Sequence, residues 1–246
     1  MPKVIVYCLL ALSTAVVFPA PGESLADEPR RWRDEAALSF VQTSGNTEVT
    51  TFAAKNDLTY KVSDQWTGKW FVSLLHGETD GVKSAERYAT DVKIDYAFSD
   101  RLYIYGLAAW LQDKFAGFDH RTYVGPGAGY HFLDGPRHFL NGELGANYAD
   151  EAYTDGSNQD FVEGRAFGRY ACAFNESVEL SQQVEYLHGF NDTEQFKLNA
   201  TTALTSKLSD RFSVKATYEI RYDNRPTPDT LEQTDALLSI ALVVKI

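Results

Sequence analysis

Long segments in which apolar and polar residues alternate constrain the fold of this chain more than any other feature. In residues 86–98, Tyr88, Val92 and Ile94 fall on one side of an extended chain. Arg87 and Asp91 fall on the other side, and this period of two is that of a β-strand. The same alternation recurs along the chain and predicts about twelve strands. We expect them near residues 33–43, 48–62, 66–77, 86–98, 101–112, 121–132, 138–149, 160–174, 177–188, 194–207, 211–222 and 233–246.

The connections between these strands alternate in kind. One set consists of tight and similar turns, which makes the internal repeat a β-hairpin: residues 62–66, 98–102, 133–137, 174–178 and 208–212. The other set is polar and mostly longer: residues 78–85, 113–120, 150–159, 189–193 and 223–232, with the short residues 44–47 as the exception. An even number of long strands, with short turns at one end and longer loops at the other, is typical of outer-membrane barrels. We therefore predict an all-β fold, a transmembrane antiparallel up-and-down β-barrel with both chain ends on the periplasmic side.

Aromatic residues on the outward side of the strands distinguish a membrane barrel from a soluble one. They gather next to the tight turns, as Tyr60, Trp66, Tyr96, Phe98, Phe132, Phe174 and Phe212, and at the opposite strand ends, as Tyr88, Trp110, Tyr148, Tyr186 and Tyr222. The stretch from Phe212 to Tyr222 spans roughly 23 Å along the membrane normal once strand tilt is included, close to the apolar band of outer-membrane barrels. A soluble core does not require aromatics at the strand ends, so the pattern favours a membrane barrel.

The inward side of the strands carries both signs of charge. We predict that the lumen is lined by Lys55, Asp57, Lys61, Arg87, Asp91, Lys93, Asp95, Arg121, Glu143, Glu163, Arg165, Arg169, Glu185, Lys215, Glu219 and Arg221. Opposite charges on neighbouring strands pair across a sheet and make a polar lining. A salt-bridged, partly plugged interior and a narrow pore both fit this pattern. Bulky inward residues such as Tyr103 and Tyr105 narrow the lumen further.

The acidic composition excludes some classes of protein. With 23 Lys and Arg against 34 Asp and Glu, the net charge is −11, and no basic run offers a nucleic-acid footprint. A mean hydropathy of −0.31 and the lack of a long apolar run beyond the N-terminus exclude a helical membrane bundle. Most of the negative charge falls on the longer loops. These are expected to face lipopolysaccharide, to which divalent cations could bridge them.

The glycine-rich residues 125–129 lie inside a strand pattern, and no helix follows as a phosphate loop requires. We expect Tyr105 opposite Gly129 and Leu107 opposite Gly127, with the glycines making room for the large side chains. Widening of a pore is the alternative role of these glycines.

The residues that carry catalysis or hold metals form no recognisable constellation. The five histidines lie on separate strands or loops and belong to no Ser-His arrangement of the kind an envelope lipid hydrolase needs. The acidic residues of the 150–160 region could gather around Ca²⁺, but their spacing fits no calcium loop, and a solvated acidic loop is the simpler interpretation: Asp150, Glu151, Asp155, Asn158 and Asp160. We predict no enzyme activity, no metal site and no cofactor.

Residues 1–26 have the pattern of a cleaved secretory signal. Lys3 gives a positive start, an apolar stretch follows, and residues 24–26 supply the small-residue cleavage site. The alternative, an anchor helix, is disfavoured because the apolar stretch is short for a bilayer. We predict a single barrel domain over residues 27–246, in which Cys172 is the only cysteine.

Two segments, residues 113–121 and 124–130, resemble the DUF481 family of YdiY-like, salt-induced outer membrane proteins. Residues 44–47, 222–226 and 234–235 are similar to the same family. The resemblance implies an outer-membrane β-barrel without an assigned activity, linked to salt or envelope stress. One departure is the C-terminal Ile246, where such barrels usually end in an aromatic residue read by the barrel-assembly machinery.

These observations predict a porin-like protein of the cell outer membrane. Its role is structural, or it forms a narrow passive diffusion path for small solutes and ions. A specific channel or binding protein for a small solute and a soluble periplasmic β-barrel are the alternatives. Expected partners are outer-membrane lipid, lipopolysaccharide and the barrel-assembly machinery, with no nucleic acid; the oligomeric state is left open.

Overall fold

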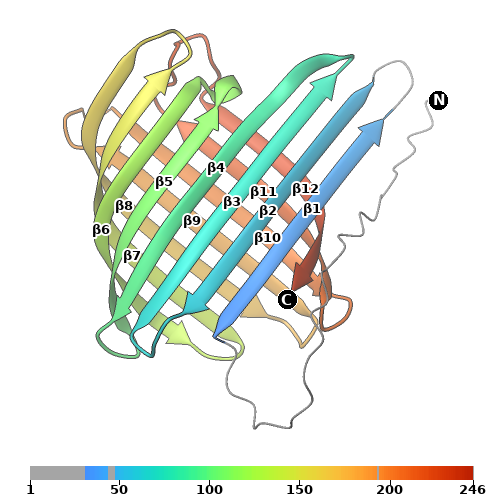
Figure 1. The fold of residues 1–246 in the computed structure, drawn as a ribbon, viewed down its shortest axis with the longest axis vertical. Helices are drawn as coiled ribbons and strands as arrows, with labels where there is room; N and C mark the ends of the chain where they lie inside the picture. Colours follow the sequence, from blue (N-terminus) through green and yellow to red (C-terminus); the bar gives the residue numbers. More distant parts are fainter. Residues whose placement is uncertain (1–30, 44–47, 193, 246) are drawn as a thin grey trace.

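The chain folds into a closed barrel of twelve antiparallel strands (Figure 1). The computed structural model describes residues 31–43, 48–192 and 194–245. Each strand pairs with its neighbours in sequence, and β1 pairs with β12 to close the ring. The strands are β1 (Trp32–Thr43), β2 (Val49–Lys61), β3 (Trp66–Thr79), β4 (Val82–Ala97), β5 (Leu102–Asp113), β6 (Phe118–Asp134), β7 (His138–Tyr153), β8 (Asn158–Ala173), β9 (Val178–Gly189), β10 (Phe196–Lys207), β11 (Phe212–Asp223) and β12 (Thr234–Lys245). The predicted all-β, twelve-stranded barrel is confirmed. The predicted signal, residues 1–26, lies outside the described residues.

The alternation of the sequence becomes the alternation between lumen and outer surface. In β5, Leu102 and Ile104 are 46% and 45% exposed, whereas Tyr103 and Tyr105 between and beside them are 5% and 4% exposed. Between the register shifts, the antiparallel ladders place odd-numbered residues opposite odd-numbered ones, as in the pair Arg121 and Glu151. Over these stretches, odd-numbered side chains face the lumen and even-numbered ones face outward. The shifts lie near strand ends, where pairs such as Asp113 and Phe118 break this parity.

One end of the barrel, here named the turn end, carries the connections 62–65, 98–101, 135–137, 174–177 and 208–211. In the four connections of equal length a side chain caps the turn: the oxygens of Ser63, Ser99, Asn175 and Ser209 accept the backbone N–H three residues on, at 2.9–3.1 Å. Backbone hydrogen bonds place Arg31 and Lys245 at this end too. The two ends of the described chain thus share the turn end, as predicted.

The opposite end, the loop end, differs from the prediction. The strands β4, β7 and β8 extend into residues 82–85, 150–153 and 158–159, which were expected to be loops. The hairpin between β3 and β4 turns through only two residues, Asp80 and Gly81, at φ of 51° and 75°. Ladder hydrogen bonds need no apolar side chains, so strands that continue beyond the apolar band are polar and escape a search for hydrophobic alternation. Residues 224–233 form the longest connection that is described in full.

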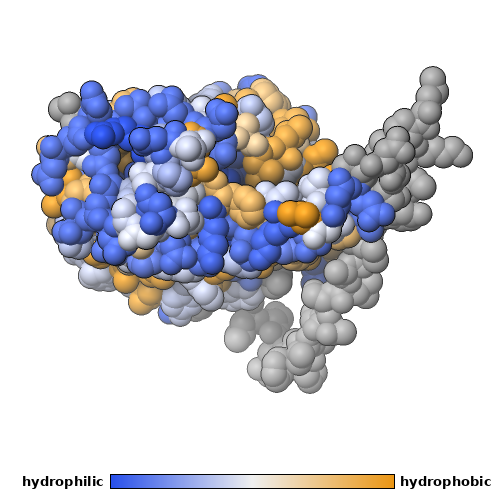
Figure 2. Space-filling model, turned by 90° about the horizontal axis from the view of Figure 1, so that it is seen from above, coloured by the Kyte–Doolittle hydropathy of each residue, from blue (hydrophilic) through white to orange (hydrophobic). Residues whose placement is uncertain are grey.

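The outer wall is apolar, and aromatic residues lie near both of its edges. Leu144 and Leu238 are each 71% exposed, Trp66 is 47% exposed near the turn end, and Tyr148 is 51% exposed near the loop end. Viewed from the loop end, hydrophilic residues gather around the rim and hydrophobic ones along the wall (Figure 2). No helix of the described chain is long and apolar enough to cross a membrane.

The pairing of β5 with β6 corrects the predicted register by two residues. Tyr105 lies opposite Gly127, Leu107 opposite Gly125, and Tyr103 opposite Gly129. An irregularity between Leu111 and Asp113 shifts the ladder, and the short helix η1 (Lys114–Ala116) then tightens the connection. A bulge is a long-range feature of strand pairing, and nothing in the alternation of either strand signals it.

The ladder that closes the ring is the shortest. Strand β1 pairs with β12 only from Glu35↔Lys245 to Leu38↔Leu242, whereas it pairs with β2 along its whole length. The two strands diverge toward the loop end (Figure 1).

Candidate functional site

The lumen is the candidate functional site, and its charged residues form three clusters. The first, the Glu143 cluster, lies toward the turn end of β4, β5, β7 and β8. The Glu143 carboxylate accepts hydrogen bonds from Lys93, from the Tyr103 hydroxyl at 2.6 Å and from Arg165 at 2.9 Å. Arg165 also donates to Glu185 at 2.7 Å. Glu143 is 4% exposed, so its charge depends on these donors for stabilisation.

The second, the Arg121 cluster, lies toward the loop end of β6, β7, β8 and β10. Arg121 donates to Glu151 and, at 2.8 Å, to both oxygens of Glu163. Lys197 donates to Glu151 at 3.0 Å, and the Tyr153 hydroxyl donates to the same carboxylate. Arg121 is 3% exposed and Glu151 is fully buried, so this cluster is cut off from water.

The third, the Asp113 cluster, crosses the lumen. Asp113 at the loop end of β5 lies 3.0 Å from Arg221 of β11 and 3.5 Å from Arg87 of β4. Strands β5 and β11 lie on opposite sides of the ring, because the strand order follows the sequence. Lys55 of β2 pairs with Glu219 of β11 nearby. These ion pairs link opposite walls of the lumen.

Large side chains of β5 fill the lumen against glycines of β6. A Cβ built on Gly127 would lie 2.2 Å from the ring of Tyr105, and one on Gly129 would lie 2.2 Å from the ring of Tyr103. The glycines thus make room for the tyrosines, as expected, and they do not widen the lumen.

We expect Gly127→Ala to lower the free energy of unfolding by about 1–3 kcal/mol, because the added methyl group overpacks the Tyr105 ring. Gly106→Ala is the matched control. Gly106 lies on the outward side of β5, where an added Cβ meets nothing within 4 Å. Denaturant unfolding of the two variants in lipid vesicles measures the difference. Equal stabilities would show that the Tyr105 ring has room to move.

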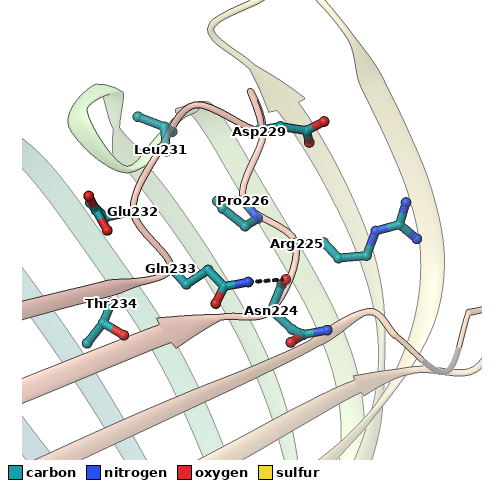
Figure 3. A pocket seen from close by; sticks show the side chains of 8 residues that line it. All are labelled: Asn224, Arg225, Pro226, Asp229, Leu231, Glu232, Gln233 and Thr234. Atoms are coloured by element: carbon teal, nitrogen blue, oxygen red, sulfur yellow. Dashed lines mark hydrogen bonds between the residues drawn. The ribbon is translucent and has the colours of Figure 1, made fainter.

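The connection 224–233, here named the strap, bridges the loop end of the lumen (Figure 3). Its Thr227 carbonyl and Leu231 side chain lie against Gly117, so close that a Cβ on Gly117 would meet them at 2.1 and 2.7 Å. Arg225 pairs with Asp192 at 2.5 Å. Residues 224–226, 229 and 231–234 line a cavity of about 580 Å³ beside the strap. Because Gly117 joins β5 to β6, on the far side of the ring from β11 and β12, the strap reaches across the mouth of the barrel.

The turn end of the lumen is open beside β1 and β8 to β12, away from the Glu143 cluster. A cavity of about 650 Å³ there is lined by residues from β1 and from β8 to β12, among them Arg169, Lys215, Val243 and Lys245. Arg169 is exposed, and so is Asp57 on β2. Lys215 and Arg169 act electrostatically on the Asp57 carboxylate. The half of the lumen beside β4 to β8 is therefore filled. The half beside β1, β2 and β9 to β12 is accessible to water at the turn end.

The predicted lumen residues fall into groups. Eleven of the sixteen belong to the three clusters and the ion pairs around them: Lys55, Arg87, Lys93, Asp95, Arg121, Glu143, Glu163, Arg165, Glu185, Glu219 and Arg221. Lys61 ends β2 and pairs with the turn residue Asp64 at 3.5 Å, which places it at the rim. Asp57, Asp91, Arg169 and Lys215 have no ion-pair partner within 4.0 Å among the described residues. Whether these residues line a conducting path stays a prediction.

Sequence reasoning assigned two central residues to loops. Asp113 and Glu151 were expected in the acidic connections 113–120 and 150–159, but both point into the lumen. Their odd numbers continue the inward parity of β5 and β7, and this parity is the signal that identifies them.

The five residues weighed as calcium ligands do not converge. Glu151 is held by Arg121, and Asp160 accepts a hydrogen bond from Tyr148 at 3.0 Å. Hydrogen bonds from Ser157 lower the pKa of the Asp155 carboxyl within its own turn. No group of three or more potential metal ligands occurs in the part of the chain that the structure describes.

The family model of DUF481, described as a protein of unknown function, matches residues 36–246. The chain belongs to the DUF481 family. It is 27% identical over 208 residues to the uncharacterized protein YdiY of Escherichia coli (strain K12), covering 82% of this chain and 79% of that protein.

Solved structures share the fold of this DUF481 barrel. An outer membrane channel from Pseudomonas putida F1 superposes with a TM-score of 0.51 at 11% identity, covering 93% of this chain and 99% of the channel. The NanC porin superposes with a TM-score of 0.50 at 9% identity, covering 87% and 97% of the two chains. At these identities the likeness shows an outer-membrane type of barrel fold and nothing finer.

Proposed function

We propose that this protein is exported by its N-terminal signal, inserts into the outer membrane and forms a narrow passive path for small solutes and ions. The observation that carries the proposal is the asymmetry of the lumen. The Glu143 and Arg121 clusters fill one half, whereas Asp57 and Arg169 are exposed in the other half, beside the cavity at the turn end.

The outer wall supports the membrane location. Exposed apolar residues such as Leu144 and Leu238 would be costly in water. The ladders between neighbouring strands satisfy most backbone groups within lipid, and the shorter β1–β12 ladder is the exception. Lipopolysaccharide and the barrel-assembly machinery are the partners that this location implies. A link to salt or envelope stress belongs to the same proposal, and growth of a deletion strain in high salt tests it.

Conductance of the purified protein in a planar bilayer tests the path. We expect small steps above background, because filled clusters leave only part of the lumen open. Arg169→Glu together with Lys215→Glu should shift the ion selectivity toward cations, since both residues face the open half. The absence of conductance at any voltage would contradict a path.

A barrel with a purely structural role is the second candidate. The strap and the Asp113–Arg221 pair favour it, because both bridge the mouth of the lumen. Neither proposal assigns catalysis, and the proteins compared above are a porin, a channel and an uncharacterized protein.

A further inference from the structure

The seam between β1 and β12 is incomplete. Its ladder ends at Leu38↔Leu242, so residues 39–42 of β1 and 234–241 of β12 have no partner across the seam among the described residues. Each of these stretches pairs normally on its other side, with β2 and β11. Unpaired backbone groups are tolerated at membrane depth only where they are buried in protein or line a water-filled cavity. This part of the seam is therefore the place in the described wall where the lumen can communicate with the outside.

Apart from Asp235 at the loop end, which lies opposite Arg221, the inward wall on either side of the open seam carries no charge. This neutral wall consists of Ala37, Ser39 and Val41 of β1 and Leu237, Ser239, Ala241 and Val243 of β12. It contrasts with the charged lining of β4 to β8. From Leu237 to Val243 the wall extends roughly 20 Å along the strand. An acyl chain that spans half of a hydrocarbon core of about 30 Å fits within this length.

Toward the turn end, the neutral wall borders a basic region. The cavity at the turn end includes Val243 of the neutral wall, and its lining has more bases than acids: Arg33, Arg137, Arg169, Lys207, Lys215 and Lys245 against Glu35, Glu176, Glu179 and Asp210. Arg33 and Lys245 both pair with Glu35, and Lys207 pairs with Asp210. Arg169 and Lys215 have no ion-pair partner within 4.0 Å among the described residues. Asp57 is the acid that interacts with both of them electrostatically, and two cations beside one carboxylate can still bind a further anionic group.

We propose that the open seam admits an anionic single-chain amphiphile, of the class of long-chain carboxylates, from the membrane into the lumen. The apolar chain lies on the neutral wall, and the carboxylate is held by Arg169 and Lys215. The strap bridges the mouth of the barrel, so the lateral opening is the direct entry for a molecule that already resides in lipid. The inference rests on the membrane location proposed above and does not require conduction along the barrel axis.

Closing the seam tests the proposal. In a Cys172→Ser background, Phe40→Cys with Ile240→Cys extends the observed register by one outward-facing pair into the open stretch. Ala36→Cys with Val244→Cys is the matched control, since these outward residues are already paired. The probe is dansyl-undecanoic acid, and its transfer from lipid vesicles into the reconstituted protein is followed by fluorescence. Oxidation of the first pair should slow transfer by about tenfold or more, and reduction should restore it. Oxidation of the control pair should change nothing.

A second variant removes the two cations that are proposed to bind the carboxylate. Arg169→Ala with Lys215→Ala should weaken binding of the probe by about tenfold, because the carboxylate loses its cations. Unchanged transfer with the seam oxidised, or unchanged binding in this double variant, would overturn the proposal. If the Phe40→Cys/Ile240→Cys pair forms no disulfide, the double variant alone decides. A protein that conducts ions in bilayers but binds no probe refutes only this inference, whereas a protein absent from the outer membrane refutes the proposed function as well.

Discussion

Replacing Arg121 with alanine is expected to lower the free energy of unfolding by about 3–5 kcal/mol. Arg121 donates to Glu151 and to Glu163, which are 0% and 1% exposed. Lys197 remains beside Glu151, but after the substitution only the amide of Asn147 donates to Glu163. A buried carboxylate without a cation is far more costly than the pair it came from. Denaturant unfolding of the protein refolded into lipid vesicles measures the loss.

Two controls separate this effect from the removal of an arginine as such. Arg169→Ala removes an exposed guanidinium that forms no ion pair with any residue the structure describes, and its effect should stay within about 0.5 kcal/mol. Arg121→Lys keeps the charge but loses the simultaneous contact with two carboxylates, so we expect an intermediate loss. If Arg121→Ala proves as stable as Arg169→Ala, the Arg121 cluster is hydrated and the filled half of the lumen described above does not exist.

Shortening the strap is expected to raise the single-channel conductance several-fold. Replacing residues 225–232 with two glycines removes Leu231 and the Thr227 carbonyl from Gly117 on the far wall, and it removes the Arg225–Asp192 pair. The mouth of the lumen then loses its cover, while the strands β11 and β12 keep their ladder. Conductance in planar bilayers at fixed salt measures the change.

Asp229→Ala with Thr230→Ala is the control for the shortened strap. Both residues are exposed on the strap, and the substitutions keep its length, so the conductance should stay at the value of the original protein. An unchanged conductance after shortening would place the narrowest part of the path at the Glu143 and Arg121 clusters.

The sequence predicted the barrel because alternation is a local property of each strand. Arg87, Asp91 and Lys93 are odd-numbered and share one side of β4. This side is the one that faces the lumen. Strand ends at the loop end were harder to predict, since residues such as Glu151 and Asp113 are polar whether they lie in a loop or in a lumen. Parity identifies them only if the strand is assumed to continue.

Other features depend on contacts between distant segments. The two-residue error in the register of Tyr105 lies in the connection between β5 and β6, where the ladder shifts near Leu111 and η1 closes the hairpin. Leu231 approaches Gly117, which is far from it in sequence. The β1–β12 ladder, which ends at Leu38↔Leu242, also depends on two strands from opposite ends of the chain. No local pattern encodes such contacts, because they follow from the closure of the ring.

Cell fractionation combined with heat-modifiable gel mobility tests the central claim, a closed barrel in the outer membrane, most directly. The account predicts that the protein sediments with the outer membrane. Because the folded barrel is compact, the unboiled sample should migrate differently from the boiled one. Recovery in the soluble periplasmic fraction, with identical mobility before and after boiling, would contradict it.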